Sequence, residues 1–425
     1  MPAAHTGASA AAWSDAPPPT SDLGHRPGDI GFRRANLALF AAGVATFVLL
    51  YCTQGLLPVL SDDLGLTPGQ ASWTASAATL GLALALLPAS ALSDRFGRTA
   101  MMTASVFGAS AIGIVLPFAP DLTTLVALRV LQGAALAGLP ATAMAFLAEE
   151  LHPSALAGAM GLYVAGNSIG GMGGRLLSGW VAAAWGWRWG VASAALLALA
   201  CAVAFRLLVP AARQFRRAPV NARALARTVG EHLRNPLLAR LYALGALFMA
   251  VFGAVYNTAG YRLIAEPFGL PESLAASIFV IYLVGTGTSA SAGRLAGRLG
   301  RRGALYAAIG TTSAGLLVSL GDTLLCALLG LVLITAGFFA GHAVASSSVG
   351  RTATTGRAQA SALYLITYYI GNSIGGTLGA DAYHAWGWDG AALFSLAAMA
   401  AAAGVTLWAT RRAVLAHRAT GLAAS

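Results

Sequence analysis

The sequence predicts an all-α membrane protein with twelve transmembrane helices, arranged as two six-helix bundles that are related by pseudo-two-fold symmetry. Three observations lead to this fold class. The 425-residue chain is 57% hydrophobic and only 10% charged, whereas soluble domains carry about 25% charged residues. Twelve apolar runs reach the length of roughly 20 residues that a helix needs to cross a bilayer. One hexapeptide occurs twice, once in each half of the chain.

The apolar runs form two sets of six. The first set covers about 35–57, 72–92, 99–119, 123–148, 157–182 and 188–209, and the second covers about 238–262, 273–293, 303–320, 323–349, 359–382 and 390–410. We therefore expect a disordered N-terminal tail over 1–34, bundles over 35–209 and 238–410, a basic linker over 210–237 and a C-terminal tail over 411–425. Leu225, Val229 and Leu233 would share one helical face in the linker, so an interfacial helix and a flexible basic segment both remain open.

The repeated hexapeptide indicates an internal duplication. Residues 166–171 and 371–376 both read Gly-Asn-Ser-Ile-Gly-Gly, and a Trp-Gly-Trp follows each copy at 185–187 and 386–388. A second pair of similar segments, 92–98 and 295–301, lies in the same order at nearly the same spacing. Small residues at this spacing let membrane helices approach closely. We expect tight, sliding helix crossings at Gly166, Gly170, Gly171, Gly371, Gly375 and Gly376.

The positions of the charges predict the orientation in the membrane. All 26 basic residues are arginine, and most lie in the tails and in loops that follow even-numbered spans. Loops that follow odd-numbered spans carry acids, such as Asp62 and Glu266. The positive-inside rule therefore places both termini and the linker in the cytoplasm. The net charge of +11 then faces anionic lipid and not nucleic acid, and we expect a multi-pass monomer in a bacterial cytoplasmic (inner) membrane.

The sequence contains few of the residues and motifs that enzymes use for catalysis. The absence of lysine excludes a P-loop lysine and a Schiff base. Cys52, Cys201 and Cys326 are isolated in apolar runs, which argues against a disulfide or a metal site. Metalloprotease and hydrolase motifs and paired carboxylates are also missing. We expect no enzymatic activity and no cofactor, with a proton gradient as the source of energy.

Two arginines lie inside predicted spans, where a charge needs a partner or a function. Arg129 lies in the fourth span, three residues before Gln132, and Arg175 lies in the fifth. Either arginine is a cavity cation that binds substrate or communicates with a proton site, or carbonyls and polar neighbours such as Gln54 satisfy it. Both interpretations stay open from the sequence alone.

Two further titratable groups lie in the second half of the chain. His342 falls in the tenth span and Asp381 near the outer end of the eleventh. Histidine titrates near neutral pH, so it suits proton coupling; a hydrogen-bonded core histidine and an acid that merely ends a span are the alternatives. The proton-coupling candidates are Arg129, His342 and Asp381.

Polar and aromatic side chains recur in the first, seventh and eleventh spans. Tyr364 and Tyr368 share a helical face. Tyrosines inside a membrane are typical of a cavity for an amphipathic organic molecule, although interfacial anchoring is the alternative for Tyr51, Tyr163 and Tyr261. The substrate-cavity candidates are Gln54, Arg129, Gln132, Asn167, Arg175, Tyr256, Asn257, His342, Tyr364, Tyr368 and Asn372.

Residues 92–98, Leu-Ser-Asp-Arg-Phe-Gly-Arg, resemble the signature between spans two and three of the major facilitator superfamily, G-x-L-a-D-r-x-G-r-r. The second copy has Gly297 in place of the aspartate. The resemblance implies that Asp94 accepts hydrogen bonds from Arg98, caps a helix of the opposite half and stabilises the outward-open state. The implied conformational switch comprises Asp94, Arg95, Gly97, Arg98, Glu149, Glu150, Arg298 and Arg301.

Two further motifs resemble proton-coupled members of that superfamily. Arg129-xx-Gln132-Gly133 is similar to the span-four signature, and residues 166–174 are similar to the span-five antiporter signature, one residue shorter and without its proline. Residues 148–153 and 159–163 resemble the YnfM-like, arabinose-efflux-type branch of drug:proton antiporters. The resemblance implies proton-coupled multidrug-type efflux of a drug, sugar or metabolite by alternating access. The alternatives are a proton-coupled symporter or exchanger of an organic anion, and a membrane receptor or scaffold that does not transport.

Overall fold

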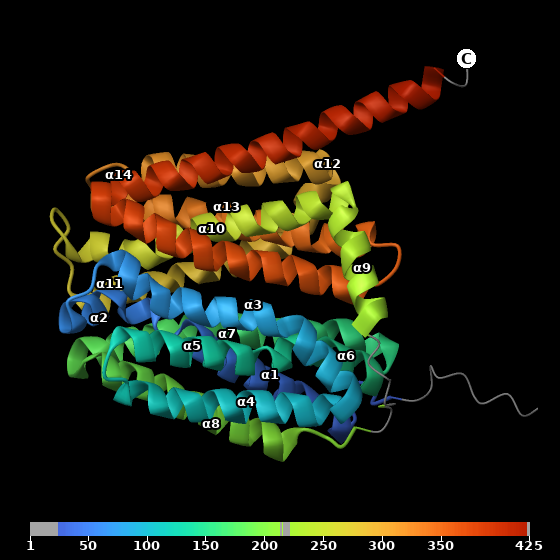
Figure 1. The fold of residues 1–425 in the computed structure, drawn as a ribbon, viewed down its shortest axis with the longest axis horizontal. Helices are drawn as coiled ribbons and strands as arrows, with labels where there is room; N and C mark the ends of the chain where they lie inside the picture. The colour runs from blue at the N-terminus through green and yellow to red at the C-terminus, as the bar shows by residue number, and fades with distance from the viewer. Residues whose placement is uncertain (1–23, 213–214, 216–221, 423–425) are drawn as a thin grey trace, which may run out of the picture.

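The structure, a computed structural model, describes residues 24–212, 215 and 222–422. The first half of the chain contains α1 (Ile30–Tyr51), α2 (Leu57–Leu64), α3 (Pro68–Phe96), α4 (Arg98–Val115), α5 (Leu122–Leu136), α6 (Gly138–Glu150), α7 (Pro153–Trp185) and α8 (Trp187–Leu208). After α9 (Ala222–Arg234), the second half contains α10 (Pro236–Ile264), α11 (Glu272–Ala276), α12 (Tyr282–Val318), α13 (Leu324–Thr352) and α14 (Arg357–Leu422). Figure 1 shows the two halves side by side, with their long helices running in similar directions.

The described helices account for twelve membrane crossings. Nine helical stretches are long and apolar enough to cross a membrane. Two of them are kinked, α12 at Gly300 and α14 at Trp386 and Gly387, so each supplies two crossings. The twelfth is α7, which is not among these nine but is long enough to cross a membrane with its 33 residues. The protein thus has the predicted all-α fold of two six-helix bundles.

Positive φ angles at four glycines mark the duplication in the backbone. Gly97 separates α3 from α4 with a φ of 102°, and Gly300 makes the corresponding kink with a φ of 70°. Gly186 and Gly387 repeat the pattern at the centre of the two Trp-Gly-Trp motifs, with φ values of 85° and 61°. Only glycine adopts such angles without strain. The repeated motifs are therefore repeated turns.

Three segments at the predicted boundaries differ from the sequence-based ranges. Helix α1 begins at Ile30, five residues before the predicted span. Backbone hydrogen bonds join His25 to Glu150 and His152, so the segment before α1 is ordered from Gly24; residues 1–23 of the predicted tail lie outside the described residues. Residues 222–234 of the predicted linker form the helix α9, and its position at the membrane interface stays a prediction. Residues 213–214 and 216–221 of the linker lie outside the described residues. Helix α14 continues to Leu422 because neither glycine nor proline interrupts residues 405–420.

Glycines of the repeated hexapeptide, together with Gly174 and Gly379 after the two copies, lie at helix crossings inside each half. Gly171 and Gly376 of the hexapeptide instead face side chains, those of Arg175 and Asn257. Glycines 166, 170 and 174 of α7 face Phe40, Val44 and Val48 of α1, and glycines 371, 375 and 379 of α14 face Ala246, Ala250 and Ala254 of α10. A Cβ atom at any of these six positions would overlap the facing residue. These contacts give the glycines a packing role within one half. Sliding of helices at these positions stays a prediction.

We expect Gly375→Val to destabilise the protein by about 1–3 kcal/mol, because overpacking forces the backbones apart. Its added methyl groups would collide with Ala250 of α10. Thermal unfolding of the purified protein measures the change. Gly404→Val, also in α14 but with no neighbouring atom within 4 Å, is the matched control and should change the stability by less than about 0.5 kcal/mol. Equal effects of the two variants would contradict the packing role.

Candidate functional site

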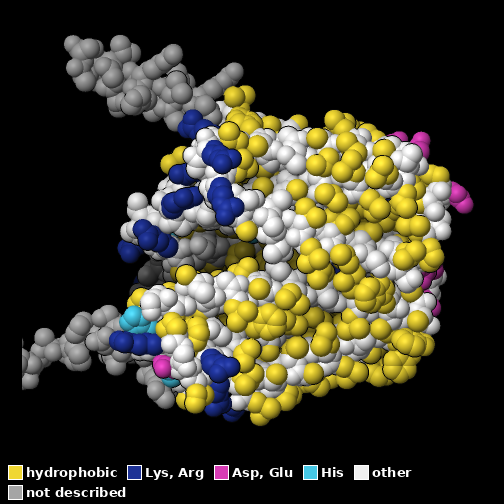
Figure 2. Space-filling view, turned by 180° about the vertical axis from the view of Figure 1, so that it is seen from behind, with side chains coloured by type: hydrophobic (Ala, Val, Ile, Leu, Met, Phe, Trp, Pro, Cys, Tyr) yellow, Lys and Arg dark blue, Asp and Glu magenta, His cyan; other side chains and the backbone are white. Residues whose placement is uncertain are grey.

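The two ends of the molecule differ in charge. The arginine-rich end carries Arg95, Arg98, Arg298, Arg301 and Arg302, and the acidic end carries Asp62, Asp63, Glu266, Glu272 and Asp322. Figure 2 shows the arginines gathered along one edge and most of the visible acids along the opposite edge. A hollow between the two halves opens at the arginine-rich edge in the same view.

Side-chain hydrogen bonds between the two halves extend from the acidic end to the middle of the helices. They join α2, α3, α7 and the short segment between α1 and α2 to α10, α14 and the short segment that follows α11. The side-chain pairs are Gln54–Asn257, Ser61–Tyr261, Ser72–Asn257, Ser76–Thr377, Thr79–Asn372 and Trp180–Ser277. The halves are therefore closed together at the acidic end and apart at the arginine-rich end.

A chain of hydrogen bonds crosses this closed interface. Arg175 Nε donates to Gln54 Oε1 (2.6 Å), and Gln54 Nε2 donates to Asn257 Oδ1 across the interface (2.5 Å). Asn257 Nδ2 then donates back to Ser72 Oγ (2.6 Å), and Ser72 Oγ donates to the carbonyl of Gly376 (3.0 Å). All four side chains are at least 96% buried, so each bond forms out of water, where leaving a partner unsatisfied is costly. We call this chain the gate relay.

Arg175, the first donor of the gate relay, is surrounded by aromatic rings. Its guanidinium carbon lies 3.8 Å from the ring centre of Tyr51, 4.7 Å from that of Tyr282 and 5.3 Å from that of Phe279. Tyr51 belongs to the first half, whereas Phe279 and Tyr282 belong to the second. The cation therefore attracts rings from both halves.

Arg129 has very different surroundings. It is completely buried. It donates to the carbonyls of Leu49 (2.8 Å), Leu50 (2.7 Å) and Thr74 (2.8 Å) and to Gln132 Oε1 (2.6 Å). The first two carbonyls end α1, where helix geometry leaves carbonyls without partners and with partial negative charge. All of these partners lie in the first half, which favours the structural interpretation of Arg129 and Gln132.

His342, Tyr364 and Tyr368 come together in the second half. The Tyr364 hydroxyl lies 2.9 Å from His342 Nδ1, and the Tyr368 ring centre lies 4.7 Å from that of His342. Tyr256 belongs to the adjoining aromatic cluster, where its hydroxyl is 2.6 Å from Thr335 Oγ1. Phe252, Phe279 and Tyr282 pack around Tyr256. The predicted aromatic residues thus form one continuous group beside Arg175.

The remaining candidates occupy three separate places. Asn372 is buried and donates to Thr79 Oγ1 across the interface (3.1 Å). Asn167 packs against Gly43 of α1, inside the first half. Asp381 is exposed at the acidic end, and its Oδ1 lies against Gly69 at the start of α3. Asn372 and Asp381 therefore touch the opposite half, whereas Asn167 does not take part in the closed interface.

The implied conformational switch is assembled only within the first half. Arg98 pairs with Asp94 Oδ1 (2.5 Å) and with Glu149 Oε1 (2.9 Å), and Arg95 stacks on Phe96. Glu150 is buried. Arg298 and Arg301 are exposed and form no ion pair with any described residue, since Gly297 replaces the aspartate there. Asp94 makes no hydrogen bond to a described residue of the second half, because the halves are apart at this end.

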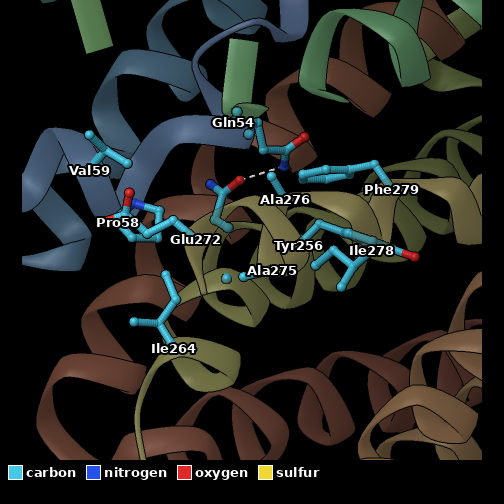
Figure 3. A pocket seen from close by; sticks show the side chains of 14 residues that line it. Gln54, Pro58, Val59, Tyr256, Ile264, Glu272, Ala275, Ala276, Ile278 and Phe279 are labelled. Atoms are coloured by element: carbon cyan, nitrogen blue, oxygen red, sulfur yellow. Dashed lines mark hydrogen bonds between the residues drawn. The ribbon is translucent and has the colours of Figure 1, made fainter. Parts of the chain in front are cut away.

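A small pocket lies on the acidic side of the gate relay. Its lining residues include Gln54, Asn257, Tyr256, Phe279 and Glu272. In Figure 3 the dashed hydrogen bond of Gln54 joins the first half to the second beside this pocket. The gate relay therefore closes the path between the hollow and the acidic surface.

The sequence did not indicate Ser72, Ser76, Thr377, Phe279 or Tyr282. Each is a common residue in an apolar or mixed stretch, and none belongs to a motif. The sequence offers one indication of the interfacial serines and threonine, which is that their hydroxyls lie within spans that the repeat assigns to opposite halves. Partners 185–304 residues apart cannot be matched from such a signal alone.

The sequence model of the Major Facilitator Superfamily matches residues 39–346. The chain belongs to this superfamily. It is 41% identical over 363 residues to the inner membrane transport protein YnfM of Escherichia coli, covering 85% of this chain and 87% of YnfM. It is 38% identical over 365 residues to the uncharacterized MFS-type transporter YybF of Bacillus subtilis, covering 86% and 90% of the two chains.

Solved structures agree on the fold of this superfamily member. A bacterial homologue of the human lysosomal transporter Spinster, in an inward-facing and occupied conformation, has a TM-score of 0.72 at 17% identity. The match covers 90% of this chain and 98% of that chain. The protein is therefore a multi-pass membrane transporter of the major facilitator fold and not an enzyme.

Proposed function

We propose that this transporter exports a small organic molecule in exchange for protons, by alternating access, and that the arrangement described here faces the cytoplasm. On this proposal the arginine-rich end, with both termini, is cytoplasmic. The distribution of arginine supports this orientation, because arginine is retained on the cytoplasmic side of membranes. The similarity to an inner membrane transport protein supports the location in a bacterial inner membrane.

The observation that carries the proposal is the asymmetry between the two ends. The halves are hydrogen-bonded together at the acidic end, and a hollow opens between them at the arginine-rich end (Figure 2). Transport requires the opposite arrangement as well, which the Arg98 ion pairs would stabilise once the arginine-rich ends meet. Rocking of the two halves about a central site exchanges the two arrangements.

Two groups are placed to couple this movement to protons. His342 is hydrogen-bonded to Tyr364 beside the aromatic group, where protonation would change the charge next to the cargo. Asp381 lies against Gly69 of the opposite half, where protonation would weaken its contact with the positive N-terminal end of α3. We propose that one of these groups carries the proton, since Arg129 is occupied by backbone carbonyls.

Proton-coupled flux in proteoliposomes tests the function. Vesicles that contain the purified protein and an entrapped pH-sensitive dye receive a panel of sugars, cationic dyes and organic acids. We expect at least one compound to move against its gradient when a pH gradient is imposed, and a protonophore to abolish this accumulation. A transport rate that does not change when the pH gradient is imposed would contradict proton coupling. Equal, zero flux of the wild type and Asp94→Asn across the panel would favour a receptor or scaffold.

A further inference from the structure

The charge of Arg175 lacks a counter-ion. No carboxylate of a described residue lies within ion-pair distance of its guanidinium. The side chain is 98% buried, and it donates hydrogen bonds to neutral acceptors, the carbonyl of Gly171 (2.6 Å) and Gln54 Oε1 (2.6 Å). Buried charges in proteins are normally paired with an opposite charge. An anion from outside the chain would supply that charge.

A second unsatisfied group lies beside this cation. The Tyr282 hydroxyl is buried and has no hydrogen-bond partner, and its ring centre is 4.7 Å from the Arg175 guanidinium carbon. A phenol donates readily to a carboxylate oxygen, and an arginine fork can donate to both oxygens at once. The two groups therefore offer a carboxylate both hydrogen-bond donors and an opposite charge. A neutral ligand gains only the hydrogen bonds, and a cationic ligand is repelled by the charge.

The walls around Arg175 suit a planar apolar body. Rings of Tyr51 and Phe279 flank the guanidinium. The aromatic group continues from Tyr282 through Phe339 and Phe338 to His342 and Tyr368. Aromatic surfaces bind flat rings by offset stacking and edge contacts.

We infer that the cargo is an aromatic organic anion, with its carboxylate bound by Arg175 and Tyr282 and its ring packed within the aromatic group. This inference rests on the proposed transport function. Arg129 offers no comparable site, because its donors are already occupied by Leu49, Leu50, Thr74 and Gln132.

The position of Arg175 also links cargo to the gate. The same guanidinium that would bind the anion donates to Gln54 at the start of the gate relay. A carboxylate is a stronger acceptor than an amide oxygen, so the anion competes with Gln54 for this donor. Cargo binding then weakens the closure at the acidic end, which is the end at which export must release it.

Binding of matched naphthyl compounds to the purified, detergent-solubilised protein tests the inference by calorimetry. The probes are 1-naphthoate, the neutral 1-naphthamide and the cationic 1-naphthylmethylamine. We expect the wild type to bind naphthoate at least ten-fold more tightly than the other two. We expect Arg175→Gln to lose this preference, Tyr282→Phe to weaken naphthoate binding several-fold, and Arg175→Lys to be intermediate. Arg188→Gln, which removes an exposed ion pair with Asp63, should bind like the wild type.

Several outcomes would overturn the inference. They are equal affinity for the three probes, absence of naphthoate binding, and an anion preference that survives in Arg175→Gln. If Arg175→Gln does not fold, unchanged naphthoate affinity in both Arg175→Lys and Tyr282→Phe overturns it. Flux is measured separately in proteoliposomes. Naphthoate binding through Arg175 without any flux would support the anion site and contradict the transport function. Export of cations that does not depend on Arg175 would support the transport function and contradict the anion site.

Discussion

Arg129→Ala is expected to destabilise the protein by roughly 3–5 kcal/mol, the usual cost of breaking a buried charged network. The substitution leaves the carbonyls of Leu49, Leu50 and Thr74 without their donors in a dry interior. Folded proteins have only about 5–15 kcal/mol of stability, so much of the variant should fail to accumulate. Thermal unfolding of the purified protein and the yield of monodisperse protein measure the effect.

Arg188→Ala is the control for this variant. Arg188 forms an exposed ion pair with Asp63, and such pairs contribute about 0–1 kcal/mol. A melting temperature of Arg129→Ala equal to that of the wild type, together with lost proton-coupled flux, would contradict the structural role. That result would restore Arg129 as a proton-coupling residue.

Gly179→Val should prevent closure at the acidic end. A Cβ atom on Gly179 of α7 would lie 2.5 Å from Ala276 Cβ of the opposite half and 2.8 Å from the carbonyl of Gly55. The contact with Ala276 is too short for packed atoms, so the halves must separate there. We expect transport to fall at least ten-fold, since each tenfold change needs only about 1.4 kcal/mol of altered equilibrium, and the population to shift toward the arrangement that is open at the acidic end.

Accessibility of a buried position measures this shift. Ser76 is fully buried at the interface, and Ser76→Cys in a background without the native cysteines reports opening by its rate of maleimide labelling. Labelling should be fast with Gly179→Val and slow without it. Gly173→Val, in the same helix but with no atom within 4 Å, is the matched control. Equal labelling of all three proteins would mean that Gly179 does not control closure.

The fold was predictable because it follows from two long-range regularities of the sequence. Apolar runs of bilayer length define the crossings, and the repeated motifs set the division into halves. The boundaries were less accurate where no residue forces a helix to begin or end. Helix α14 passes the predicted end at residue 410, and α1 starts before the predicted residue 35.

The candidate site was only partly predictable. Arg129 and Arg175 are the same residue type at similar depth in neighbouring spans, yet carbonyls occupy the first and aromatic rings surround the second. Which surroundings each arginine meets depends on where α1 ends and which helices of the other half lie opposite. Gln54 and Asn257 were expected in a cavity, but their bond to each other depends on the closed arrangement.

A disulfide across the acidic end tests alternating access most directly. The hydroxyls of Ser76 and Thr377 lie 3.0 Å apart on opposite halves, so Ser76→Cys with Thr377→Cys places two thiols within bonding reach. A control pair inside the first half, Gly113→Cys with Ala195→Cys, has its Cβ atoms 3.2 Å apart. In a background without native cysteines, oxidation of the first pair should abolish flux, reduction should restore it, and the control pair should keep transporting in both states. Full flux through protein with the Ser76–Thr377 pair completely cross-linked would show that the halves need not separate there, and would contradict alternating access through this gate.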